Sequence, residues 1–537
     1  MANISFKSDN QQQTLLLPPS LEELIPLTHP VRVLNDIVNR LDVSELLGSY
    51  KGGGNSCFHP RGMLKILLYA YLNNIYSSRR IEDQLHENIH YMWLSGGAKP
   101  DFRTINYFRG KRLKDKFGGI FTQVVELLHG EGFVSLDVQY VDGTKIESAA
   151  NKYSFVWRGS VEKNDVRLKE KTRSILTVIE ESIRVELSEE EHTCQTVTPE
   201  DFQARVERIK ARMETVRVPK KIRTTIRKVE EESIPRMARH EEQLHTMQGR
   251  NSYSKTDPDA TFMRMKEDAM LNGQLKPGYN VQVSTENQFI THFEIYQRPT
   301  DTGTLIDYLE SFRSRYGRNS AEVVADAGYG SEQNYEYLFN QDIIPYVKYN
   351  YFHKEQKRST RNNPFLQQNL SYNASRDYLI CPMGQKLSRV YNKKQVSDLG
   401  YVSSIAMYRA QRCEGCPLRG KCFNAMGNRM VGINHKLQGY KQKVRELLTS
   451  ERGLYHRSMR PIEPEAVFGQ IKSARLFRRF LLRSMEKVKV EFGLVAMAHN
   501  IRKWAKRLCF DGFFCCLMKN TAFFTHFFKL EVIFVIP

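Results

Sequence analysis

The order of strand and helix signals between residues 136 and 350 constrains the fold more than any other feature of the chain. VSLDVQYVDGTKIES alternates β-branched residues and predicts a strand that carries Asp142. Two apolar runs around Thr285-Glu286-Asn287 predict a hairpin, and a helix is expected at 303–316. AEVVADAGYG predicts a buried strand that ends at Asp326, and a helix and a strand near IIPYVKYN follow. This alternation predicts an α/β fold.

Helical segments flank and interrupt this α/β region. Residues 20–130 repeat apolar side chains at helical spacing, and Ser78 and Asp101 are expected to act as N-caps. Residues 160–250 are rich in Glu, Arg and Lys and nearly free of Gly and Pro, which predicts a helical insertion. Helices are expected again at 435–450 and 464–505.

The helical N-terminal region has two interpretations. SSRRIEDQLHENIHYMWLSGGAKPDFRTINYFRGKR places short helices around a turn, with Arg103 and Arg109 on or near the last one. A helix-turn-helix that contacts DNA has this form. A small helical bundle that packs on the rest of the chain fits the same pattern equally well.

Positive charge is concentrated in the second half of the chain. The net charge is +20, and residues 351–510 contain 32 Lys and Arg against 10 Asp and Glu. So basic a surface repels itself, which favours contact with phosphates over a merely solvated face. The charge therefore predicts a polyanionic partner.

Neither end of the chain resembles a membrane segment. MANISFKSDNQQQT lacks the apolar core of a secretory signal, so we expect a cytoplasmic protein. The apolar stretch near the C-terminus is interrupted by Asp511, Lys519 and Glu531, and no transmembrane helix is expected there.

Three acidic residues stand where they could converge. Asp142 lies in a strand, Asp326 ends another strand, and Glu465 begins a helix. Phosphodiester chemistry with two metal ions needs carboxylates that hold them, and Mg²⁺ needs only two or three because it keeps several waters. Taken singly, an acid in such a position is more often a turn or cap residue than a metal ligand. Asp257 and Asp259 are assigned to turn chemistry, with Asp259 expected to cap a helix that begins at Ala260.

Four cysteines form a spaced cluster. Cys381, Cys413, Cys416 and Cys422 follow the pattern C-x31-C-x2-C-x5-C. Four thiolates suit tetrahedral Zn²⁺ in a structural site. Reduced free thiols in a basic loop are the alternative.

Several motifs in a consistent order resemble bacterial insertion-sequence transposases of the DDE class. The resemblance extends over about residues 15–508. Its matching stretches are PDFRTINYFR, YVDGTKIES, TDPDATFMRMK with GYNVQV, VVADAGYGS, EAVFGQIK and FRRFLLRSMEKVKVEFGLVAMAHNIRKW.

The resemblance implies a division of the chain. It implies an α/β catalytic domain with a ribonuclease-H-like mixed sheet flanked by helices at 136–508. This domain would carry a helical insertion at 160–250 and a Cys-rich insertion at 372–430. A helical DNA-binding domain is expected at 15–130, and the apolar tail at 509–537 does not match the family.

The resemblance also implies that Asp142, Asp326 and Glu465 bind Mg²⁺ or Mn²⁺. Glu463 competes for the third position, but Glu465 and Lys472 keep the six-residue gap of similar transposases and lie two helical turns apart. Lys472 is expected to contact a phosphate at the element end, although an ordinary surface lysine fits as well. Arg475, Arg478 and Arg479 are expected to continue the same helix and to bind phosphates. Tyr455 and Arg460 do not keep the tightest family spacing, which leaves their roles open.

The expected function is therefore metal-dependent cleavage at the ends of a mobile element, followed by transfer of the 3′-hydroxyl ends to target DNA. The partners would be double-stranded DNA, namely the terminal inverted repeats and the target, and a second copy of the chain in a homodimer. A bacterial cytoplasmic protein of this kind would associate with the nucleoid when bound to DNA. Two alternatives remain: an inactive sequence-specific DNA-binding protein, and a simple metal-dependent nuclease.

Overall fold

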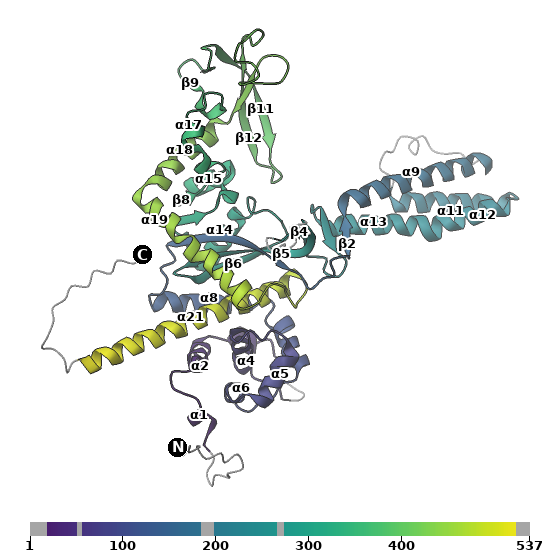
Figure 1. The fold of residues 1–537 in the computed structure, drawn as a ribbon. Coiled ribbons are helices and arrows are strands. Elements are labelled where there is room, and N and C mark those ends of the chain that lie inside the picture. The colour runs from purple at the N-terminus through teal and green to yellow at the C-terminus, as the bar shows by residue number, and fades with distance from the viewer. Residues whose placement is uncertain (1–18, 51–55, 184–197, 266–272, 522–537) are drawn as a thin grey trace, which may run out of the picture.

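A computed structural model describes residues 19–50, 56–183, 198–265 and 273–521. Figure 1 shows a central α/β body with a helical domain at its N-terminal end. A long helical arm projects from one side of the body, and a second β-sheet lies beyond another side (Figure 1). No helix within the described ranges combines the length and apolarity that crossing a membrane requires.

The central sheet is mixed, which confirms the predicted α/β fold. Its strands run in the order β4-β5-β1-β7-β8, and β6 pairs with β5. β1 is antiparallel to β5 and parallel to β7, which is parallel to β8. The strands are β1 (Val138–Glu147), β4 (Thr261–Arg264), β5 (Leu275–Glu286), β6 (Phe289–Tyr296), β7 (Glu322–Ala325) and β8 (Ile344–Val347). Helices α14 (Leu305–Tyr316) and α15 (Glu332–Asn340) connect the later strands.

The predicted hairpin forms with a different turn. Thr285 and Glu286 remain in β5, and the turn consists of Asn287 and Gln288 with φ angles of 53° and 60°. A two-residue turn with both φ angles positive matches the right-handed twist of the flanking strands, which explains the shift.

The N-terminal domain is helical as predicted. Asp101 caps α7, because its carboxylate accepts a hydrogen bond from the Thr104 backbone amide at 2.8 Å. Ser78 is the first residue of α5 rather than its cap. The helices are α1 (Leu21–Leu24), α2 (Pro30–Arg40), α3 (Ser44–Leu47), α4 (Pro60–Leu72), α5 (Ser78–Glu87), α6 (Ile89–Ser95), α7 (Phe102–Tyr107), a π-helical segment (Phe108–Arg112) and α8 (Phe117–Gly130).

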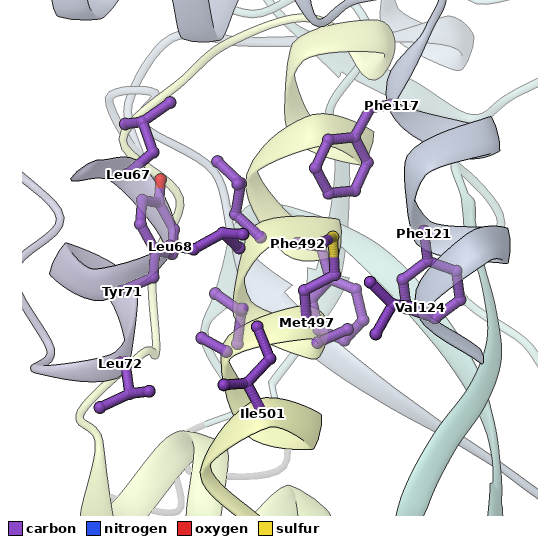
Figure 2. Close-up of a cluster of buried hydrophobic side chains, with 14 of the residues drawn as sticks. Leu67, Leu68, Tyr71, Leu72, Phe117, Phe121, Val124, Phe492, Met497 and Ile501 are labelled. Carbon is purple, nitrogen blue, oxygen red and sulfur yellow. The ribbon is translucent and has the colours of Figure 1, made fainter. Parts of the chain in front are cut away.

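One core joins this domain to the α/β body through the C-terminal helix α21 (Met485–Thr521). Figure 2 shows side chains of α4 and α8 packed on both sides of α21, where Phe492, Met497 and Ile501 point into the cluster. Gly493 of α21 permits this packing, because a Cβ there would lie 2.8 Å from Cδ1 of Phe117. Such buried apolar area makes it unfavourable for the domain to detach.

The helical insertion forms an arm with its own apolar core. Its helices are α9 (Arg158–Ile183), α11 (Pro199–Thr215), α12 (Lys220–Lys228), a π-helical segment (Val229–Ser233) and α13 (Ile234–Met247). Strands β2 (Phe155–Trp157) and β3 (Ser252–Ser254) pair at the root of the arm, where the chain leaves and re-enters the body (Figure 1).

The four clustered cysteines lie in segments that connect the strands of a second sheet, which the sequence did not predict. It is antiparallel throughout and runs in the order β13-β12-β11-β10-β9. The strands are β9 (Ser371–Asn373), β10 (Tyr378–Ile380), β11 (Lys386–Val396), β12 (Val402–Ala410) and β13 (Met430–Ile433). Short helices α16 (Phe352–Glu355) and α17 (Arg358–Arg361) precede it.

The single helix expected at 464–505 is replaced by two helical segments with a non-helical stretch between them. Helices α18 (His435–Thr449) and α19 (Glu451–Met459) lead into the π-helical segment η5 (Pro461–Glu465), α20 (Ala466–Gly469) and η6 (Gln470–Ala474). The chain then leaves the helix because Leu476 has a positive φ of 56°, and Arg479 forms a bridge with Glu147 of β1. α21 begins at Met485 and continues through residue 521. Residues 522–537 of the apolar tail lie outside the described residues.

The sequence predicts that Asp259 caps a helix that begins at Ala260, and this prediction is wrong because no helix begins there. Ala260 leads into strand β4, because this segment pairs with β5. The Asp259 carboxylate instead accepts a hydrogen bond from the backbone amide of Met485 at 2.8 Å, and Asp257 accepts one from Ser484 at 3.1 Å. Both carboxylates therefore satisfy amides at the start of α21.

Candidate active site

The two aspartates are brought together by strand register. β1 and β7 are adjacent and parallel, and Val141 pairs with Ala325. Asp142 and Asp326 are the next residues of the two strands, so they lie side by side where β7 ends. Asp142 is 9% exposed, whereas the side chain of Asp326 is 51% exposed.

The residue after Asp142 has to be glycine. A Cβ on Gly143 would overlap the side-chain amide of Gln282 and would lie 2.7 Å from Oδ1 of Asp301. Gln282 and Asn280 both donate to that same oxygen, at 2.8 and 2.7 Å. This network packs directly against β1 and holds the strand in place beside the aspartates.

The third acid comes from η5, where Glu463 and Glu465 point to opposite sides. Glu463 is 2% exposed and accepts a hydrogen bond from the backbone amide of Gln288 at 2.8 Å. Burial raises the pKa of Glu463, and the Gln288 amide partly offsets this. Glu465 is exposed and faces the same cleft as the two aspartates.

A cleft of about 330 Å³ collects these side chains. Its lining residues are Asp142, Thr144, Asp326, Arg460, Glu465, Phe468, Gly469, Lys472 and Ser473. The three acids that the sequence singled out, and Lys472, thus share one surface hollow although up to 323 residues separate Asp142 from Glu465 in the chain.

Arg460 is the member of this site whose role the sequence left open. Its guanidinium lies 3.0 Å from Oδ1 of Asp326 and 3.4 Å from Oδ1 of Asp142. Burial raises the pKa of Asp326, but the charge of Arg460, the Ala327 amide and Lys348 outweigh it, so this pKa lies below its ordinary value. The guanidinium therefore supplies positive charge between two carboxylates that would otherwise repel each other.

Helix α19 presents Arg460 through a row of residues spaced four apart. Arg452 and His456 both contact Glu322 at the start of β7, each at 2.9 Å. Nδ1 of His456 also lies 2.8 Å from the hydroxyl of Tyr140 on β1. The same face of the helix is thereby attached to both strands that carry the aspartates.

The basic residues expected to bind DNA divide into exposed and buried groups. Lys472 lines the cleft but is itself only 6% exposed, and it donates to the backbone carbonyl of Lys145 at 2.9 Å. Arg478 and Arg479 are exposed, but they lie beyond the end of the helix, in the segment that pairs with β1. Arg475 is 4% exposed, and burial lowers its pKa to about 10. The expected phosphate contact of Arg475 is therefore not supported, because its side chain is turned into the protein.

The two N-terminal arginines differ in the same way. Arg103 is exposed beside Phe102. Arg109 is 3% exposed and donates to the hydroxyl of Tyr71 at 3.0 Å and to the carbonyl of Tyr76 at 2.7 Å. Arg109 thus joins helices inside the domain, and its expected contact with DNA is not supported.

All four clustered cysteines line one enclosed cavity of about 30 Å³. Cys381 follows β10, and Cys413, Cys416 and Cys422 follow β12. Arg429 reaches the same place, where its Nη1 lies 2.9 Å from Sγ of Cys422. The cavity therefore gathers residues from the chain segments before and after the β11–β12 hairpin.

The donor types of both clusters fit the metals that the sequence predicted, but neither cluster is closed around a point. Within the described ranges, no three His, Cys, Asp or Glu side chains are grouped so that they could hold one ion. In the cleft, Arg460 lies between the two aspartates. Carboxylate oxygens on an open hollow suit Mg²⁺, whereas enclosed thiols suit Zn²⁺.

Two family matches cover separate parts of the chain. Residues 380–505 match the family described as Transposase DDE domain, and this range includes Glu465, Lys472 and the four cysteines. Residues 19–111 match the family described as Transposase domain (DUF772), which corresponds to most of the helical N-terminal domain. No curated protein and no solved structure matches the chain.

Proposed function

We propose, from the premise that this chain belongs to the insertion-sequence transposases of the DDE class, that it cuts the ends of its element and joins them to new DNA. The observation that carries the proposal is the single cleft that unites Asp142, Asp326 and Glu465 with Lys472. The mixed sheet with Asp142 on its central strand also fits a ribonuclease-H-like catalytic core.

The three carboxylates would hold two divalent metal ions, Mg²⁺ or Mn²⁺. Such ions, when bound, supply Lewis-acid stabilisation of the attacking and leaving oxygens of a phosphodiester. Lys472, in the wall of the cleft, would bind a phosphate of the DNA strand that enters it. Arg460 would exchange its two aspartates for a DNA phosphate, because a guanidinium binds phosphate through the same paired donors.

The reaction consists of two phosphoryl transfers. A water oxygen attacks the phosphorus at the element end, the bond to the 3′ oxygen breaks, and that oxygen takes up a proton. The freed 3′-hydroxyl then attacks a target phosphodiester and releases a target 3′-hydroxyl. Each step exchanges one phosphorus–oxygen bond for another, so no high-energy cofactor is required.

The other parts of the chain would position DNA around this cleft. We assign recognition of the element ends to the helical domain at 15–130 and phosphate contact to the basic region at 351–510. The catalytic domain would span 136–508 with insertions at 160–250 and 372–430. Two ends must be brought together, which implies a homodimer on DNA. The cysteine cavity would bind a structural Zn²⁺.

A second candidate function rests on Arg460. A guanidinium between two aspartates also satisfies an ion-pair network with a purely structural role, as in a DNA-binding protein that does not cut. A simple nuclease would share the acids but would not join ends.

The test is cleavage and joining of labelled DNA that carries the element's own terminal repeats, with Mg²⁺. We expect the wild type to cut and join, and Asp326→Asn to bind DNA without doing either. Asp137→Asn is the matched control, because Asp137 precedes β1 at the opposite end, where it pairs with Arg318 on the surface. Equal behaviour of wild type and Asp326→Asn would reject the triad, and cutting without joining would favour the nuclease.

A further inference from the structure

The helical arm separates its apolar and charged residues in an informative way. Its core is formed along the shaft by Leu176, Phe202, Val206, Ile209 and Met237. Residues 158–183, 198–215 and 230–247 of the shaft carry 12 Lys and Arg against 14 Asp and Glu, and some of them are paired: Lys169 lies 2.9 Å from Asp165, and Lys210 lies 2.6 Å from Glu230. The shaft therefore presents a nearly balanced surface to solvent.

The outer end of the arm has a different composition. Residues 216–229 contain six cations and no acidic residue. All six are exposed: Arg217, Lys220, Lys221, Arg223, Arg227 and Lys228. Figure 1 shows this segment, which includes α12, at the end of the arm farthest from the body. We call residues 216–229 the arm tip.

Within the described part of the arm, one ion pair compensates the charge of the arm tip. Arg227 lies 3.8 Å from Glu231, a pair that is exposed on both sides and contributes little. So many like charges on one short turn and helix repel one another, and this repulsion is relieved when an anion binds. A shaft of balanced charge that ends in a basic tip is suited to contact a polyanion at a distance from the body.

A basic path leads from the cleft to the root of the arm. Lys472 lies in the cleft, and the next segment of the chain carries exposed Arg479 and Arg483. These two guanidinium groups donate to backbone carbonyls of residues 148–150, at 3.0 to 3.2 Å, where the chain leaves β1 for the arm. DNA that leaves the cleft along this path runs towards the arm.

We propose that the arm tip is a second DNA-contact surface, which binds phosphates of duplex DNA well away from the cleft. This inference rests on the proposed function, because it takes the DNA in the cleft as the starting point. α9 has 26 residues, so the shaft is ~39 Å long at 1.5 Å per residue. At ~3.4 Å per base pair, the tip meets DNA about 12 base pairs or more from the cleft.

The tip contact is independent of base sequence. Its donors are Lys and Arg side chains around a short turn, and such groups bind phosphates that every duplex presents. The tip thus aligns the DNA rather than identifies it. Random-sequence duplex DNA is therefore a valid probe, and knowledge of the element ends is unnecessary for the test.

The experiment measures binding of the full chain to random duplexes of about 8 and about 30 base pairs over a range of salt concentrations. The tip variant is Arg217→Gln/Lys220→Gln/Lys221→Gln/Arg223→Gln. The matched control removes four exposed shaft cations from the same arm, in Lys163→Gln/Arg167→Gln/Lys171→Gln/Arg236→Gln. All eight side chains are exposed, and unchanged thermal unfolding verifies that both variants fold.

For the long duplex we expect the tip variant to bind at least about tenfold more weakly than wild type, with a salt slope lower by about 2 to 4, because each lost phosphate contact removes ~0.9. The short duplex cannot span the cleft and the tip together, so the tip variant should lose much less affinity for it than for the long duplex. The shaft control should behave as wild type on both.

Other outcomes overturn the inference. Equal loss in the shaft control would mean that contact is spread along the arm, and equal loss on the short duplex would mean that the tip acts nearer the cleft. A tip variant that binds both duplexes normally but changes the oligomeric state without DNA would assign the tip to a second copy of the chain. The proposed function is judged separately by Asp326→Asn, so either idea can fail alone.

Discussion

The acid cleft and the cysteine cavity are two candidate metal sites built in opposite ways. The cleft is an open hollow of about 330 Å³ lined by carboxylates, and the cavity is an enclosed space of about 30 Å³ lined by thiols. Each contains an arginine, Arg460 between the aspartates and Arg429 beside Cys422. An open oxygen site admits a substrate, whereas an enclosed sulfur site serves structure. The proposed function places chemistry at the first site and a structural role at the second.

Their construction also differs. The acids come from β1, the end of β7 and η5, and they meet only because the whole body is folded. Three cysteines lie within ten residues after β12, and Cys381 lies before β11 at the same end of the hairpin, where Leu387 pairs with Ala410. The cysteine cavity therefore depends on one local sheet, and the cleft depends on long-range packing.

The largest effect should come from the choice between two glutamates. Glu465→Gln should lower cleavage by about a thousandfold, since loss of a metal ligand costs several kcal/mol of transition-state stabilisation. Glu463→Gln is the control: it lies two residues away but is buried against Gln288, so cutting should continue. Cleavage rates with Mg²⁺ at saturating DNA decide between them. The reverse pattern would show that Glu463 is the ligand and that the cleft opens differently on DNA.

Sequence reasoning located the aspartates because strand patterns mark positions along a chain and a parallel register does the rest. Val141 and Ala325 are both buried, and the residues that follow them meet at one edge. The choice of Glu465 over Glu463 could not follow from periodicity alone, because η5 is a π-helical turn that changes the angle between them. Arg460 acts on side chains of other elements, and spacing within one segment does not reveal such contacts.

The second sheet was not predicted for a related reason. β11 exposes every residue except Leu387, so it shows no alternation of buried and exposed positions. The buried arginines were misjudged because their partners are remote in sequence: Arg109 donates to Tyr71, 38 residues away. Charge predicts exposure on average, and only the tertiary structure identifies the exceptions.

A smaller but still large effect is expected at the cysteine cavity. If Zn²⁺ is bound there, Cys413→Ser should destabilise the second sheet by more than about 3 kcal/mol, because metal binding then contributes directly to its folding. Cys57→Ser, at an exposed thiol outside the cluster, is the control. Zinc content by mass spectrometry and protease cleavage within residues 372–430 are the measurements. No zinc in the wild type, together with a silent Cys413→Ser, would make the cavity a site of free thiols.

Arg460 offers a test that applies to the acid cleft and not to the cysteine cavity. Arg460→Ala removes the guanidinium between Asp142 and Asp326, and we expect a loss of about 1 to 2 kcal/mol, reduced because Asp326 is half exposed. Mg²⁺ should restore this stability, since a ligand that binds only the folded state raises its stability by mass action. Arg457→Ala is the control on the same helix. If Mg²⁺ does not change the unfolding temperature of the wild type, Arg460→Ala or Arg457→Ala, the acids do not form a metal site.

The smallest effect concerns the support behind η5. The Gln288 amide donates to Glu463, and its carbonyl lies 2.8 Å from Nε2 of His499 on α21. Burial, together with the nearby Arg475, lowers the pKa of His499 to about 3. The unfolded histidine takes up a proton below pH ~6.5 and the folded one does not, so this residue costs about 1.4 kcal/mol of stability per pH unit as the pH falls from 6.5 towards 3.

His499→Gln keeps a donor for the Gln288 carbonyl but does not titrate. The variant should lose about 1 kcal/mol of stability relative to wild type at pH ~7.5, where the native contact is intact. Near pH ~5 its stability should equal or exceed that of wild type. Thermal unfolding of both proteins across this range gives the two slopes. Other buried histidines with lowered pKa, among them His292 and His456, act equally in both proteins and cancel in the difference. Parallel curves of stability against pH would show that His499 is not held neutral in the folded protein. Any loss of stability in acid would then have another cause.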